Sequence, residues 1–169
     1  FEFQAARRNH LPYLKLDGRQ DHLINHEPCI LVQRTTAKEQ RRRLISAVIP
    51  NSFVLEYPGY VVENHLNMVY RSRDSETGFG AIAALLNSYA LDQAFRCING
   101  SVAVSAYELN ALPLPDPEQM SELQDAAAAC VGHEDLEELI SSFYRHQRNG
   151  NRFHATTRHP RSRNRKLAA

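Results

Sequence analysis

The chain has 169 residues, of which 43% are hydrophobic and 23% charged, and its formal net charge is +1. This is enough for one globular domain with its own core, or for one domain with an appendage. No apolar run approaches the roughly 20 residues that a membrane-spanning helix needs. Residues 1–9 also lack the apolar segment of a signal peptide, so we expect a cytoplasmic protein with no membrane partner.

The N-terminal part of the chain is polar up to residue 28. Because no initiator Met precedes Phe1, we expect a piece of a longer protein, in which residues 1–28 connect to a missing N-terminal part. Four β-rich runs follow, separated by polar residues or by Pro and Gly, and each is a predicted strand. They span residues 29–35, 43–49, 52–57 and 60–70, and the first two are predicted to pair as a hairpin with a charged tip.

The fourth run, YVVENHLNMVY, alternates in the manner of a strand. Successive side chains of a strand point to opposite faces. We therefore expect Glu63, His65 and Asn67 on one face and Asn64 on the other.

The strongest helical pattern follows a polar loop at residues 71–80. Its apolar residues recur at three- and four-residue spacing from Ile82 to Ile98, and Asn99-Gly100 is a fitting stop. Residues 101–105 are strand-like, residues 106–112 form a short helical turn, and two further helices are predicted at 118–131 and 133–145. The predicted fold is α+β. It has an antiparallel or mixed sheet, a packed central helix at about 80–99 and an appended C-terminal helical pair.

The charges are distributed unevenly along the chain. Residues 145–169 hold eight basic residues and no acid, whereas residues 116–138 hold eight acids and no Lys or Arg. Residues 1–115 are nearly balanced, with 12 Lys and Arg against 11 Asp and Glu, and their cations cluster at 34–43 and around Arg71. Clustered cations on a nearly neutral body favour a local anionic partner. We expect the basic tail, residues 147–169, to be flexible, and its closing KLAA (166–169) is typical of a vector-derived linker.

Enzyme motifs are missing or out of context. The run GFGAIA matches a dinucleotide-binding fingerprint, but a polar loop precedes it where that fold requires a strand. There is no G-x-S-x-G, and no Cys or His cluster has zinc spacing; His22 and His26 lack further ligands. We therefore predict no catalytic residue, metal or cofactor within this chain, and we expect Cys29, Cys97 and Cys130 to be buried free thiols.

Two segments are candidates for nucleic-acid contact. The basic loop, residues 34–43, carries five cations, and Arg makes bidentate contacts to phosphate or guanine; the alternative is a solvated hairpin tip. The ENHLN segment offers Asn, which pairs with adenine N6 and N7; the alternative is a polar edge with local backbone hydrogen bonds. The candidate DNA-contacting residues are Arg34, Lys38, Arg41, Arg42, Arg43, Asn64, His65, Asn67, Arg71, Arg73, Ser101 and Ser105.

The order of several motifs resembles the order found in a known protein family. A helix with LLNS is followed by INGS, an alternating run and the exit ELNALPLPDPEQ. This succession resembles the distal end of the target-recognition domains of N6-adenine DNA methyltransferases from restriction–modification systems. Type I specificity subunits have a similar ending. Upstream, CILVQRTTAKEQRRRLISAVIP resembles the entry strand and basic loop of these domains, and YVVENHLNMVY resembles their Asn/His strand, so the likeness covers residues 29–119.

The resemblance implies a division of the chain and a set of partners. Residues 29–117 would be the DNA target-recognition domain and residues 118–146 a helical pair. The partners would be double-stranded DNA and an N-terminal methyltransferase domain of the same protein, whose cofactor is S-adenosylmethionine. The family's catalytic N/D-P-P-Y and its F-x-G-x-G motif are absent from this sequence, so we expect no enzyme activity in this chain alone.

Two other functions stay open at this point. The chain could serve a separate methylase as a Type I specificity subunit, although the helical pair is interrupted at Gly132-His133 and is too short for one long spacer. It could also be a protein-interaction module whose acidic helices dock a partner. That module would show no salt-dependent affinity for DNA.

Overall fold

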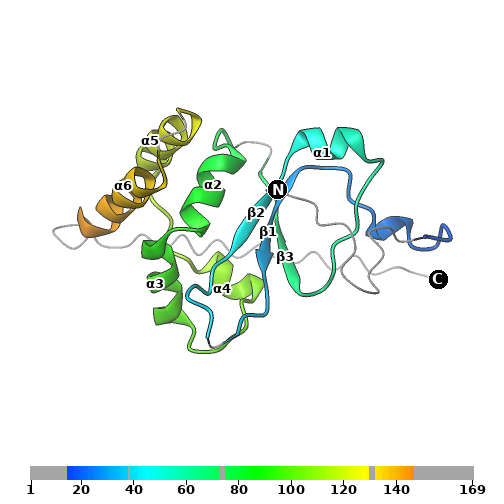
Figure 1. Ribbon diagram of the computed structural model, residues 1–169, viewed down its shortest axis with the longest axis horizontal. Coiled ribbons are helices and arrows are strands. Elements are labelled where there is room, and N and C mark those ends of the chain that lie inside the picture. The colour runs from blue at the N-terminus through cyan, green and yellow to red at the C-terminus, as the bar shows by residue number, and fades with distance from the viewer. Residues whose placement is uncertain (1–14, 38, 73–74, 130–131, 147–169) are drawn as a thin grey trace, which may run out of the picture.

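The computed structural model describes residues 15–37, 39–72, 75–129 and 132–146. It has the predicted α+β fold, with a small sheet in the middle, α2, α3, α5 and α6 on one side and α1 on the other (Figure 1). The elements are η1 (Asp21–Leu23), β1 (Cys29–Gln33), β2 (Ser46–Ile49), α1 (Asn51–Glu56), β3 (Leu66–Val69), α2 (Phe79–Leu86), α3 (Tyr89–Ile98), α4 (Ala106–Asn110), α5 (Pro117–Ala128) and α6 (His133–His146).

The sheet of the described residues is antiparallel, in the order β2-β1-β3. Ile30 of the central strand lies opposite Val48 of β2 and Val69 of β3. The predicted hairpin between the first two strands is confirmed. Cys29, Ile30 and Val32 are buried, which explains why the central strand reads as a continuous apolar run.

The predicted central helix is wrong in one respect, because it consists of two helices, α2 and α3. The break falls at Asn87 and Ser88. Ser88 has an extended backbone (ψ 150°), and its side chain caps α3 by accepting a hydrogen bond from the Leu91 N–H. The apolar spacing continues through the break, so the periodicity gave no sign of it.

The predicted strand at 52–57 is also wrong, because these residues form α1. Pro50 stands at the N-cap, and Tyr57, next to Pro58, ends the helix in an extended conformation. The Phe53 and Tyr57 rings lie four residues apart in the sequence with centroids 4.7 Å apart, a helical neighbour pair. A short apolar run of this kind does not distinguish helix from strand by its pattern alone.

Two predicted strands are shorter than expected. In the run 60–70 only Leu66–Val69 is a strand, because the Leu66 N–H bonds back to the Glu63 carbonyl and makes Asn64 and His65 a turn. The strand-like run 101–105 forms an isolated bridge, Thr35 with Ala103. The predicted helices at 106–112, 118–131 and 133–145 are confirmed as α4, α5 and α6.

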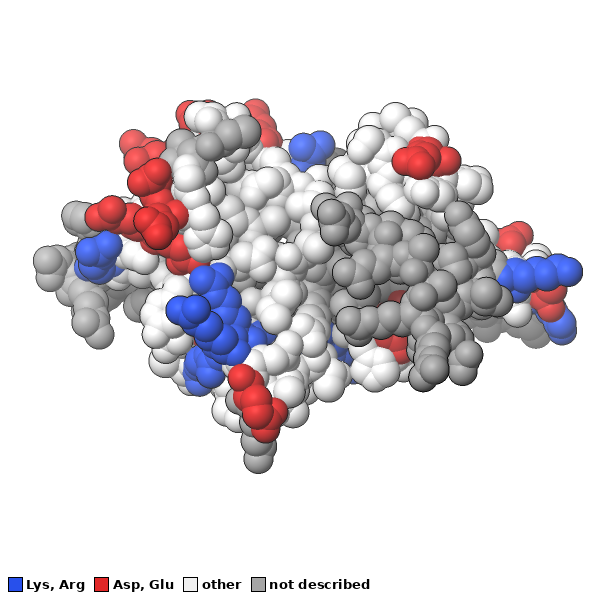
Figure 2. All heavy atoms as spheres, in the orientation of Figure 1, with Lys and Arg blue, Asp and Glu red and all other residues white. Residues whose placement is uncertain are grey.

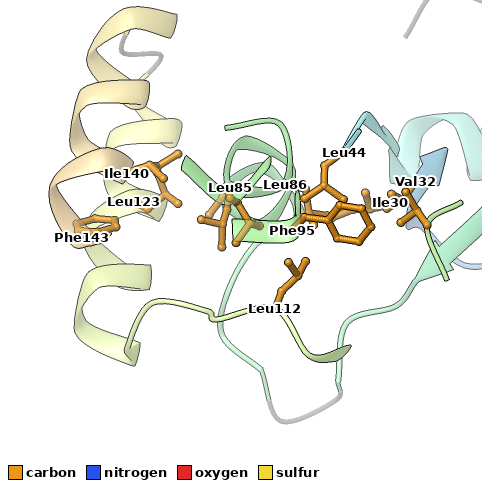
Figure 3. Close-up of a cluster of buried hydrophobic side chains, with 13 residues drawn as sticks. Ile30, Val32, Leu44, Leu85, Leu86, Phe95, Leu112, Leu123, Ile140 and Phe143 are labelled. Atoms are coloured by element: carbon orange, nitrogen blue, oxygen red, sulfur yellow. The ribbon is translucent and has the colours of Figure 1, made fainter. Parts of the chain in front are cut away.

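One hydrophobic cluster joins the sheet to the helical pair. Figure 3 shows it extending from Val32 and Ile30 through Leu85 to Leu123 and Ile140. Fully burying side chains of this size contributes about 1.5–3 kcal/mol each. The helical pair therefore packs on the same core as the sheet.

The cysteine prediction holds for Cys29, which is a buried free thiol, but Cys97 is exposed on α3. Cys130, residues 1–14 and the tail 147–169 lie outside the described residues. Within the described ranges, no helix has the length and apolar character needed to cross a membrane.

Candidate nucleic-acid interface

One end of the sheet brings three separate segments together at Arg34. The Arg34 N–H donates to the His65 carbonyl at 2.7 Å, and the Val104 N–H donates to the Arg34 carbonyl at 2.7 Å. The Thr36 N–H donates to the Val102 carbonyl at 3.0 Å, which extends this contact by two residues. We call Arg34, Asn64, His65, Asn67 and Ser105 the sheet-end cluster.

Arg34 and Asn64 are open members of this cluster. Both are exposed, and the Arg34 Nη1 donates to the Asn64 backbone carbonyl at 3.4 Å. A guanidinium has five N–H donors in a planar fork. The contact with Asn64 occupies one of them, so Arg34 can present further donors to an anion or a base edge.

His65 is held by its neighbour Glu63. The His65 Nδ1 lies 2.6 Å from Glu63 Oε1, and the His65 N–H donates to Glu63 Oε2 at 2.9 Å. These hydrogen bonds, the backbone one first, lower the pKa of the exposed Glu63 carboxyl. His65 therefore lies beside a carboxylate, which favours contact with a base edge over contact with a phosphate.

Asn67 has a structural contact. It is half-buried, and its Nδ2 donates to the Val104 carbonyl at 2.7 Å. This bond ties β3 to the segment that also pairs with Arg34. Since Val104 is fully buried, Asn67 helps to fix the position of Arg34.

The two candidate serines shape the backbone next to Arg34. The Ser101 Oγ accepts from the Ala103 N–H at 3.2 Å. Ser105 is the N-cap of α4, in a capping box with Glu108. The hydrogen bonds from Ser105 lower the pKa of the Glu108 carboxyl.

The basic loop is anchored through a buried carboxylate that the sequence analysis did not single out. Asp92 is 0% exposed, and its Oδ1 accepts from the N–H groups of Arg43 at 2.5 Å and Leu44 at 2.9 Å. Its Oδ2 accepts from Arg96 Nε at 2.8 Å. The Asp92–Arg96 spacing of four residues was the available sequence signal, but it did not reveal the bonds to the loop.

Arg42 and Arg43 are turned toward the protein. Arg42 donates to the Asn87 carbonyl and pairs with Glu137 of α6 at 3.0 Å, where the two side chains are 26% and 22% exposed. Glu137 also accepts from the Tyr89 N–H at the start of α3. Arg43 donates to Thr36 Oγ1 at 2.9 Å. Both cations therefore help to hold the loop in place.

Arg41 differs from its neighbours. Its side chain is exposed, and no hydrogen bond or ion pair within the described part of the chain engages its guanidinium. Its backbone carbonyl accepts from Arg96 Nη2 at 2.8 Å, which fixes the position of the residue. Figure 2 shows Lys and Arg side chains gathered over the basic loop and α3, with the Asp and Glu side chains of α5 and α6 beside them.

The remaining candidates lie on loops. Arg71 follows β3, is exposed, and has its guanidinium 5.9 Å from the centroid of the Phe79 ring. This distance permits a cation–π contact. Lys38 and Arg73 lie outside the described residues.

Comparison with known proteins relates the chain to Type II methyltransferases. It is 32% identical over 89 residues to the Type II methyltransferase M.BsuBI of Bacillus subtilis, a match covering 51% of this chain and 17% of the relative. It is 31% identical over 98 residues to the Type II methyltransferase M.PstI of Providencia stuartii, covering 56% and 19%. The match thus spans less than a fifth of either relative's length. No family model matches the chain, and no solved structure does.

Proposed function

We propose that this chain is the DNA-recognition part of an adenine-N6 DNA methyltransferase from a Type II restriction–modification system. The observation that carries the proposal is the similarity to two Type II methyltransferases. It favours a methyltransferase over a Type I specificity subunit and over a protein-interaction module. In this proposal residues 29–117 recognise DNA. A methyltransferase domain N-terminal to them in the same protein binds S-adenosylmethionine and transfers its methyl group.

The DNA-binding surface would consist of the sheet-end cluster together with Arg41, whereas Arg71 follows the other end of β3 and would make a separate contact. Arg34 and Arg41 are exposed cations of the basic loop, and Arg71 is an exposed cation that follows β3. Phosphate contacts supply most of the affinity of such surfaces and fix their register on the duplex. We assign Arg42 and Arg43 the supporting role of holding the loop that presents Arg41.

Base readout would fall to Arg34 and Asn64. An Arg fork matches guanine O6 and N7, and an Asn amide matches adenine N6 and N7. Both side chains are exposed, and Asn67, Ser101 and Ser105 support the backbone around them. Two side chains that can recognise bases would thus be presented on a backbone that hydrogen bonds hold in place.

Salt dependence of DNA binding tests the proposal. Binding of the chain to a random-sequence duplex is measured by fluorescence anisotropy at several salt concentrations. We expect weak affinity that falls steeply with salt, since each phosphate contact adds about 0.9 to the slope of log K against log salt. The double variant Arg34→Ala/Arg41→Ala should flatten this slope.

The matched control is Lys15→Ala/Arg19→Ala, which removes two exposed cations of the N-terminal segment. Both double variants keep the basic tail, so the difference between them isolates the proposed surface. No binding at low salt would contradict the proposed function. Equal slopes for the two double variants would place the DNA elsewhere on the chain.

A further inference from the structure

We propose that Tyr107 is an aromatic platform at the edge of the sheet-end cluster, on which a nucleobase stacks after it has left the duplex. This inference rests on the proposed DNA-recognition function. It assigns a task to a residue that the sequence analysis did not select. It also supplies the cluster with an apolar surface, which its charged and amide groups lack.

Tyr107 is unusually exposed for an aromatic residue. Its side chain is 82% exposed, the highest value among the exposed large hydrophobic residues of the described part of the chain. Other tyrosines use their hydroxyls within the protein: Tyr60 donates to the Glu27 carbonyl, Tyr70 to Asn25 Oδ1 and Tyr144 to the Pro113 carbonyl. A single exposed apolar residue is ordinary, and what distinguishes Tyr107 is its place in the fold.

The backbone that carries Tyr107 is firmly held. Ser105 and Glu108 form the capping box at the start of α4, with Ser105 Oγ donating to Glu108 Oε2 at 2.7 Å. Buried Val104 precedes the helix and buried Leu112 follows it. The exposed ring is therefore presented by an anchored helical turn, which lowers the entropic cost of a contact.

Tyr107 follows, by three residues, the backbone contact between Val104 and Arg34. Val104 bonds to Arg34 through its N–H and accepts from Asn67 Nδ2 through its carbonyl, each at 2.7 Å. Three residues of chain from Val104 to Tyr107 span at most about 11 Å. In the proposal, the nucleotide read by Arg34, or the next one, reaches the Tyr107 ring.

The chemistry of adenine methylation provides a base that needs such a surface. An enzyme that modifies a base must take it out of the stack. The extrusion exposes the faces of bases that were stacked before. Stacking of one base on an aromatic side chain is worth about 1–3 kcal/mol and does not depend on the sequence.

The absence of Trp from the sequence allows a direct test. The variant Tyr107→Trp places a single indole at the proposed platform, and Tyr89→Trp places one at a control position on α3 that is 54% exposed. Each variant is titrated with a fully paired duplex and with the same duplex carrying one unpaired central base. We expect the emission of Tyr107→Trp to be quenched, more strongly by the bulged duplex, and the emission of Tyr89→Trp to stay unchanged.

Anisotropy of a label on the DNA, recorded in the same titration, separates the two proposals. If no DNA binds, the proposed function itself fails. If DNA binds and Tyr107→Trp is not quenched, or is quenched equally by both duplexes, the stacking proposal is overturned.

Affinity gives a second readout. Tyr107→Ala should weaken binding to the bulged duplex about 5- to 150-fold and binding to the paired duplex much less, whereas Tyr107→Phe keeps the ring and the affinity. The thermal midpoint should stay unchanged in both variants, because the side chain is exposed. Equal losses for the two duplexes would overturn the proposal.

Discussion

The side-chain amide of Asn87 is hydrogen-bonded to both backbone groups of Ser46. It accepts from the Ser46 N–H at 2.8 Å and donates to the Ser46 carbonyl at 3.0 Å. Ser46 belongs to β2, an edge strand, and its other neighbour there is Val32 of β1. Asn87 thus occupies the place of a further strand and joins the corner between α2 and α3 to the sheet.

Replacing Asn87 should destabilise the fold. Asn87→Ala leaves both backbone groups of the half-buried Ser46 without these partners, and each such loss costs about 1–3 kcal/mol. Urea unfolding followed by circular dichroism measures the effect. The exposed Asn110 on α4 is the matched control, and Asn110→Ala should change the free energy of unfolding by less than about 0.5 kcal/mol.

The fold was predictable where local pattern and burial agree. The strands β1 and β2 and the helices α5 and α6 have clear β-rich or helical sequence patterns, and all four are confirmed. The break between α2 and α3 was not predictable from the spacing, because it depends on the contact of Asn87 with a strand 41 positions away. The run 52–57, which forms α1, is too short for its apolar pattern to distinguish a helix from a strand.

The candidate site was predictable as a set of residues but not as a geometry. From the sequence alone, Arg41, Arg42 and Arg43 were equal candidates for contact with DNA. The structure separates them, because the Arg42 guanidinium pairs with Glu137 of α6, 95 positions away, and the Arg43 guanidinium donates to Thr36 Oγ1 within the loop. No pattern in the sequence pointed to Tyr107, since its significance depends on its exposure and on the contact of nearby Val104 with Arg34.

Asp92 should be essential for the placement of the basic loop. Asp92→Ala removes the acceptor of two loop N–H groups and leaves Arg96 without its carboxylate partner. Losing one partner of such a buried charged network costs about 3–5 kcal/mol. We expect a large drop in urea stability, and Asp92→Asn, which keeps one acceptor oxygen, should lose less. Equal stability of Asp92→Ala and the parent chain would contradict this role.

Asn99, and not Gly100, should hold the turn after α3. The Asn99 Nδ2 donates to the Ala103 carbonyl at 2.7 Å, and its Oδ1 accepts from the Ser101 N–H at 2.6 Å. Gly100 is exposed, and a Cβ built on it meets no atom within 4 Å. We expect Asn99→Ala to cost about 1–2 kcal/mol and Gly100→Ala to be nearly neutral, by thermal or urea unfolding. The reverse order would show that the glycine conformation matters more than the amide bonds.

The stability of the chain should fall at alkaline pH, in part through Tyr144. Burial raises the pKa of the Tyr144 phenol above its ordinary value of 10.0, and its hydroxyl donates to the Pro113 carbonyl at 2.7 Å. Above pH 10 the unfolded chain releases this proton while the folded chain retains it, so the free energy of unfolding decreases as pH rises. Burial also raises the pKa of Tyr60, which adds to the decline.

Urea unfolding from pH 8 to pH 11 checks this dependence. Tyr144→Phe should lower stability at pH 8 by about 1 kcal/mol, because it removes a hydrogen bond, but its decline above pH 10 should be shallower. Tyr107→Phe, at an exposed position, should follow the parent curve. A Tyr144→Phe curve parallel to the parent curve at all pH values would rule out this contribution.

Arg41 and Arg42 are adjacent, but substituting Arg42 should mainly lower stability, whereas substituting Arg41 should mainly lower the salt slope of DNA binding. Arg42 bonds to Asn87 and Glu137, so Arg42→Ala removes a link between the loop, the corner between α2 and α3, and α6. Since this pair is only partly buried, we expect a loss of about 1 kcal/mol in urea stability, with a smaller change in the salt slope of DNA binding.

Arg41→Ala removes an exposed cation that has no partner within the described part of the chain. It should leave stability unchanged and lower the salt slope by about 0.9. If both variants change the slope equally while stability is unaffected, the loop is not held as the structure indicates. If neither changes it, the basic loop does not contact DNA.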